Sequence, residues 1–149
     1  MSFRQKKNFP VTTITPDFPK KYFKLIVYIP FGVLEVTKIE NEPFNGSLQI
    51  IEGKLYLGDR LTVFDYHQEG YLEKFLAGEY LSIDESGKLT MRSHPHLGFN
   101  VESPTGPWGE GAFTYNGESD FQLCGDNLIG FRSNCTGAFR IAIAYTEIL

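Results

Sequence analysis

The sequence predicts an all-β protein, and three observations support this class. Residues that favour strands are abundant, with 13 Phe and 8 Tyr among 149 residues and many short runs of Val, Ile and Thr. Apolar segments recur at roughly ten-residue spacing and are separated by turn residues. No segment shows helical periodicity or the strand–helix alternation of an α/β protein. We therefore expect a single domain of about eleven or twelve antiparallel strands.

In the first half of the chain, prolines and glycines mark where strands end. Pro30 ends the first strand because proline lacks the N–H group that a β-ladder needs. Asn45 and Gly46 predict a turn before the third strand, and Gly53 with Lys54 predicts a tight hairpin after it. In chain order, the strands expected here cover residues 22–29, 32–39, 47–52, 55–57 and 60–66.

The second half continues the same rhythm up to a terminal hairpin. Residues 85–87 predict a turn, and residues 103–111 form a loop rich in Pro and Gly. The strands expected before the hairpin cover residues 73–76, 80–83, 88–93, 98–102, 112–116 and 121–124.

The last 22 residues, from Leu128 onward, predict a hairpin with one large and one small face. Its first strand ends near Phe131, and the turn contains Ser133, Asn134, Thr136 and Gly137. Alternation on the return strand places Phe139, Ile141, Ile143 and Tyr145 on one face, and Ala138, Arg140, Ala142 and Ala144 on the other.

Residues 1–21 differ in charge from the rest of the chain. They carry a net charge of +4, which leaves −8 for the remainder of a chain whose net charge is −4. Pro10, Pro16 and Pro19 favour an extended conformation. We expect an extended basic arm over 1–21, followed by an all-β domain over 22–149. The arm is expected to be a solvated tail or an edge strand, or else to contact a neighbouring subunit or an acidic surface.

Composition argues against several classes of protein. No apolar run approaches the roughly 18 residues that a membrane span needs. Nucleic-acid binding is disfavoured because the body of the chain is acidic and the isoelectric point is near 5.4. The N-terminus lacks the apolar stretch of a secretory signal, so a cytoplasmic or virion-associated protein is expected rather than a classically secreted one. For the same reason, Cys124 and Cys135 are expected to be free, buried thiols rather than bridged.

Residue patterns that carry catalysis or metal binding are sparse. His94 and His96 would face the same side of a strand, but Pro95 between them indicates a bend, and a metal would need further ligands. The sequence contains no Gly-x-Ser-x-Gly nucleophile motif and no phosphate-binding loop. We therefore expect a non-enzymatic protein without a cofactor or metal.

Three segments of the C-terminal half form a recognisable series: Leu76-Ala-Gly-Glu-Tyr-Leu, Gly106-Pro-Trp-Gly, and Gly130-Phe followed by a glycine turn and a final strand. On these segments, residues 71–149 resemble jacalin-related lectins. The resemblance implies a β-prism of three antiparallel sheets, and a β-sandwich or jelly roll is the alternative. It also implies sugar binding, in which an Asp closing the last glycine turn accepts hydrogen bonds from sugar hydroxyls. This chain has Ile141 at that position, which cannot accept a hydrogen bond, so the implied site is altered or degenerate.

Candidate ligand-binding residues lie around this turn. Arg132 and Arg140 would favour an acidic sugar or another ligand with a carboxylate, because a guanidinium group donates hydrogen bonds to such oxygens. Phe139 would stack on a sugar ring if exposed, although its phase with Ile141 favours the core. Trp108 would either stack on a ligand or partner or anchor its own loop. The complete set is Arg132, Asn134, Thr136, Gly137, Phe139, Arg140 and Trp108.

Two functions follow from these observations. The first is a non-catalytic carbohydrate-binding domain with an altered sugar site. The alternative is a structural or assembly protein, such as a virion, tail or decoration subunit, that forms homo-oligomers through its β-surface and its basic arm.

Overall fold

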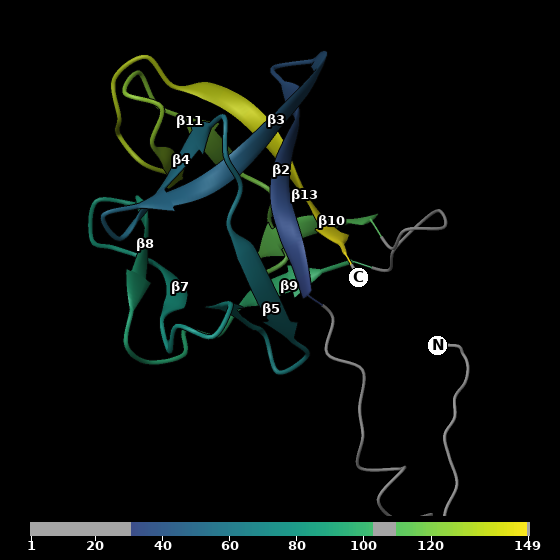
Figure 1. The fold of residues 1–149 in the computed structure, drawn as a ribbon. Coiled ribbons are helices and arrows are strands. Elements are labelled where there is room, and N and C mark those ends of the chain that lie inside the picture. The colour runs from purple at the N-terminus through teal and green to yellow at the C-terminus, as the bar shows by residue number, and fades with distance from the viewer. Residues whose placement is uncertain (1–30, 103–109, 149) are drawn as a thin grey trace, which may run out of the picture.

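The computed structural model describes residues 31–102 and 110–148. All regular elements in these two ranges are strands, which confirms the all-β class (Figure 1). These ranges contain no helix with the length and apolarity that a membrane crossing requires. The expected arm over 1–21 and the expected strand over 22–29 lie outside the described residues. The strands are β2 (Phe31–Ile39), β3 (Glu42–Ile51), β4 (Lys54–Gly58), β5 (Val63–His67), β6 (Tyr71–Lys74), β7 (Tyr80–Ile83), β8 (Leu89–Arg92), β9 (Phe99–Val101), β10 (Glu110–Tyr115), β11 (Phe121–Leu123), β12 (Ile129–Phe131) and β13 (Phe139–Glu147).

The strands pair in antiparallel fashion into one connected sheet that closes on itself. Seven strands in the order β2-β3-β4-β8-β7-β6-β5 return to β2, because Phe31 to Val33 pair with Asp65 to Val63. Closure leaves these strands without free edges. These pairings do not confirm the three separate sheets of a β-prism or the two sheets of a sandwich.

The twelve strands of the described residues divide into three consecutive four-stranded units, β2–β5, β6–β9 and β10–β13. Each unit contains one central hairpin, formed by β3–β4, β7–β8 or β11–β12. The third strands of the units meet in a triangle, so the units are related by an approximate threefold axis, in the strand plan of a β-trefoil. The pairs that form the triangle are Lys54 with Thr90, Lys88 with Gly130, and Leu128 with Tyr56.

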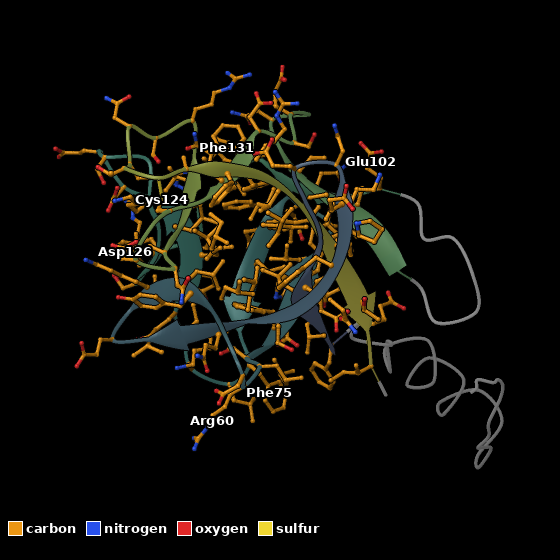
Figure 2. The ribbon with its side chains drawn as sticks, turned by 90° about the horizontal axis from the view of Figure 1, so that it is seen from above. Arg60, Phe75, Glu102, Cys124, Asp126 and Phe131 are labelled. Atoms are coloured by element: carbon orange, nitrogen blue, oxygen red, sulfur yellow. A yellow bond between two sulfur atoms is a disulfide. The ribbon has the colours of Figure 1, made fainter. Side chains whose placement is uncertain are left out.

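Equivalent positions of the three units build the core. The third strand of each unit buries one aliphatic side chain completely, and the second strand buries one large apolar side chain. The first set is Leu55, Leu89 and Ile129, and the second is Leu48, Leu81 and Phe121, all with 0% exposure. All six belong to the hydrophobic core, and Figure 2 shows side chains filling the space that the strands enclose. The core therefore lies on the axis, and it leaves the turns between strands free to form surface features.

Backbone geometry repeats with the same symmetry in the turns before β4, β8 and β12. Gly53, Gly87 and Asn127 all have positive φ, at 79°, 87° and 69°. Each of their carbonyls accepts a hydrogen bond from the neighbouring unit, from Met91, Phe131 and Leu57 respectively, at 2.7 to 2.9 Å. Glycine and asparagine tolerate this conformation, which would strain other residues. The predicted hairpin at Gly53 and the predicted turn at residues 85–87 are confirmed.

Two predicted turns are wrong. Asn45 and Gly46 lie inside β3, at an irregularity opposite residues 36–38 of β2, and the chain turns at Glu40 instead. Gly46 pairs with Val36 in the ladder, and the irregularity places Phe44 and Asn45 opposite the single residue Thr37. The terminal hairpin is wrong as well, because β11 lies between β12 and β13 and pairs with both.

Candidate functional site

The loop between β12 and β13, residues 132–138, contains most of the predicted ligand-binding residues. A disulfide anchors it, joining Cys124 to Cys135 with Cα atoms 5.6 Å apart. The expectation of free thiols is therefore wrong. It rested on the absence of a signal sequence, which carries no information about distance in the fold. The two cysteines meet because the backbone N–H of Gly125 donates to the carbonyl of Thr136 at 2.9 Å, which holds the loop against the β11–β12 turn.

Ser133 provides a second anchor for the loop. The side-chain oxygen of Gln122 in β11 accepts from both the backbone N–H and the hydroxyl of Ser133, at 2.7 and 2.9 Å. A Cβ atom at Gly87 would lie 2.8 Å from the Cβ of Ser133, and one at Gly130 would lie 2.6 Å from its hydroxyl oxygen. The loop thus packs closely on the β7–β8 turn and on β12, and it is held in one geometry.

Arg132 is engaged within the protein. Its guanidinium lies 2.6 Å from the carboxylate of Asp120 and 3.2 Å from that of Glu118, and Nε also donates to Asp120. All three side chains are about half exposed, so the pairs contribute little stability. They do engage the guanidinium with two carboxylates of the protein, so it is not the free group for binding an anion that the sequence suggested.

A shallow hollow of about 540 Å³ lies beside the disulfide. Asp126 is exposed in the β11–β12 turn, and its Oδ1 accepts from the Leu128 N–H at 3.2 Å, which orients the carboxylate. Figure 2 shows Cys124 and Asp126 on the same side of the molecule. A second hollow of about 380 Å³ adjoins the first and shares Lys88, Asn134 and Cys135 with it. The residues that line the first hollow are Lys88, Cys124, Gly125, Asp126, Asn134, Cys135, Thr136 and Gly137.

Phe139 and Arg140 lie apart from this hollow. They border a smaller one of about 140 Å³ with Asp120 and Arg132. Phe139 is 51% exposed, although its phase predicts a core position. It lies at the start of β13, beyond the end of the core, whereas Ile141 is 2% exposed. Arg140 is fixed by its backbone N–H, which donates to the Glu40 carboxylate at 2.8 Å.

The structure therefore brings together Asn134, Thr136 and Gly137 and separates them from Phe139 and Arg140. Trp108 lies outside the described residues. Lys88 and Asp126 also line the hollow, and sequence reasoning missed both. They belong to turns of two different units and are distant in sequence, so no local motif marks them as neighbours.

The two histidines of the His94-x-His96 pattern do not converge. His94 is exposed, whereas His96 is half-buried between two hydroxyl groups. Its Nδ1 lies 3.0 Å from the Ser82 hydroxyl and its Nε2 lies 2.8 Å from the Tyr115 hydroxyl. Burial, with a smaller contribution from the positive charge of Arg92, lowers the pKa of His96 below its usual value of 6.5.

We expect this histidine to make stability fall in mild acid. The unfolded chain binds a proton at pH below about 6.5 while folded His96 stays neutral, so stability rises with pH between the lowered folded pKa and the unfolded pKa. If the unfolded chain binds one proton more than the folded chain, the free energy of unfolding changes by about 1.4 kcal/mol per pH unit. This slope is the largest that His96 alone can produce. Urea unfolding between about pH 5 and about pH 7.5 measures it. His96→Gln should flatten the profile and His94→Gln should not; equal slopes for His96→Gln and the wild type would contradict the assignment.

Comparison with known proteins gives no match: no family model, no curated protein and no solved structure is significantly similar to this chain.

Proposed function

We propose that this chain is a non-catalytic carbohydrate-binding domain whose site is the hollow beside the Cys124–Cys135 disulfide. One observation carries the proposal: a loop held by a disulfide and by Ser133 borders a shallow hollow with several polar groups on its rim. Its rim offers a carboxylate, an amide, a hydroxyl and an ammonium group, from Asp126, Asn134, Thr136 and Lys88.

These groups match the hydrogen-bonding needs of a sugar. A carboxylate accepts from hydroxyls, an amide both donates and accepts, and an ammonium donates to ring or carboxylate oxygens. Asp126 supplies the acceptor that the resemblance to lectins places at position 141, where this chain has a buried isoleucine. Lys88 extends the range of ligands to sugars that carry a carboxylate. Because the loop is already fixed, binding orders little new structure, which favours affinity.

The experiment is a glycan array probed with oxidised, unglycosylated protein. Glycosylation is avoided because Asn134-Cys-Thr136 is itself an acceptor sequon. We expect Asp126→Asn to weaken binding about 10- to 100-fold, because a hydrogen bond to a charged group contributes about 1.5–3 kcal/mol. Asp59→Asn, an exposed carboxylate that does not line the hollow, is the matched control. An array without hits for the folded protein, or equal affinities for both variants, would contradict the proposal.

The assembly alternative depends on the basic arm over residues 1–21, which lies outside the described residues. It stays a prediction, and it requires that deletion of residues 2–21 abolish self-association in light scattering.

A further inference from the structure

The β5–β6 hairpin gathers three potential metal ligands on one face. Asp65 and His67 are two apart on β5, so their side chains point to the same side. Glu73 on β6 lies directly opposite Asp65 in the register. One ligand atom from each of the three lies within 4.8 Å of the others.

The carboxylate of Asp65 is the unusual member of this group. The residue is 8% exposed, and its Oδ1 is fully buried with no hydrogen-bond partner among the described residues. A buried ion without a partner is unfavourable, because burial removes the water that solvates its charge. Glu73 beside it adds a like charge, and burial together with that charge raises the pKa of Asp65. Among the neighbouring groups that affect the pKa of Asp65, only His67 acts to lower it.

The distance between the other two ligands suits a metal ion. His67 Nε2 lies 3.2 Å from Glu73 Oε1. Two ligands at about 2.1 Å from a tetrahedral metal lie about 3.4 Å apart, so this pair needs little movement to bind one.

Aromatic side chains hold the hairpin face and partly shield it from water. The imidazole of His67 stacks on Tyr71 with ring centres 4.3 Å apart and planes 14° apart. Tyr71 in turn meets the edge of Tyr80 at 5.6 Å. Aromatic side chains packed against metal ligands hold the ligands in place and strengthen charge interactions at the metal site.

We propose that Asp65, His67 and Glu73 bind a single divalent transition-metal ion such as Zn²⁺, with a fourth position open to water. The mixed imidazole and carboxylate set suits zinc, whereas calcium prefers six or more oxygen ligands and magnesium retains several waters. The ion would neutralise the buried carboxylate and replace the direct contact between His67 and Glu73. This site is independent of the proposed glycan site, because the residues that line the hollow do not belong to β5 or β6.

Calorimetric titration of ZnCl₂ into the full, oxidised chain, after removal of metals with a chelator, tests the proposal. We expect one zinc ion per chain with a micromolar or tighter dissociation constant, and a higher unfolding temperature when zinc is bound. Substitution of Co²⁺ should give the strong visible absorption of a four-coordinate site, a signature that loosely bound surface metal lacks.

Variants separate this site from adventitious binding. His67→Gln and Glu73→Gln should each weaken zinc binding at least about 100-fold, since each removes a direct ligand and even supporting residues affect affinity 10- to 100-fold. His94→Gln, an exposed histidine outside the cluster, should bind as the wild type does. Circular dichroism of the metal-free variants checks that they fold. Absence of zinc binding by the wild type, equal affinity for Ca²⁺, or unchanged affinity in a folded His67→Gln variant would overturn the proposal.

Discussion

Replacement of both Cys124 and Cys135 by serine is expected to lower the free energy of unfolding by about 2–4 kcal/mol. The bond closes a loop with a sequence separation of 11 residues, so its removal returns chain entropy to the unfolded state. Urea unfolding of the wild type and the double variant measures the loss through the shift in midpoint at constant slope. A loss of this size is a large part of the usual stability of a single domain.

Reductant provides the matching control for this prediction. The described residues contain no free cysteine, so reductant acts on this bond alone within them. The reduced wild type should unfold like the double serine variant, and the variant should not respond to reductant. Reduction should also weaken glycan binding, because Cys135 and Thr136 border the hollow. Equal midpoints for oxidised and reduced protein would show that the disulfide adds no stability.

Strand positions could be read from the sequence more reliably than strand partners. The predicted strand over 80–83 coincides with β7, and those over 32–39 and 121–124 differ from β2 and β11 by one residue. Alternation reports which side chains share a face, and it carries no information about which strand lies alongside. The terminal hairpin failed for that reason, since β11 takes the place expected of β12 beside β13.

The threefold arrangement did leave a trace in the sequence. Gly53-Lys-Leu and Gly87-Lys-Leu occupy equivalent turns in the first two units. Asn127-Leu-Ile replaces this motif in the third unit, where Asn127 has the same positive φ. The third unit also uses Phe121 where the others use leucine. These substitutions keep the positive φ of the turn and the apolar character of the core position, but they hide the repeat in the sequence. The β-trefoil plan therefore became visible only from the pairings.

Only part of each candidate site could be predicted. Turn residues indicated the loop at Asn134 and Thr136, but Asp126 and Lys88 reach the hollow from other units and are distant in sequence. Recognition of the group Asp65, His67 and Glu73 required the register of two strands and the burial of one carboxylate. Neither could be derived from the sequence. Conversely, Ile141 looked like a lost ligand in the sequence, and in the structure it is a core residue paired with Phe121.

Phe99→Ala is expected to destabilise the protein by about 3–5 kcal/mol, the range for deletion of a buried aromatic side chain. Phe99 is 1% exposed and belongs to a closed circuit of five aromatic rings from β9 to β12. The ring centres of successive members are 4.9 to 5.6 Å apart. The circuit runs through Phe99, Phe113, Phe121, Phe131 and Tyr115.

Two further variants decide whether this loss comes from packing in the core. Leu97→Ala removes a side chain that is 61% exposed two residues away, and it should change stability by no more than about 0.5 kcal/mol. Phe99→Leu keeps an apolar side chain but removes the ring, and it should cost about 1–2 kcal/mol. Because Tyr115 contacts both Phe99 and His96, loss of the ring should also loosen the surroundings of His96 and reduce the pH dependence of unfolding. A Phe99→Ala variant as stable as Leu97→Ala would show that packing of the aromatic circuit does not stabilise the fold.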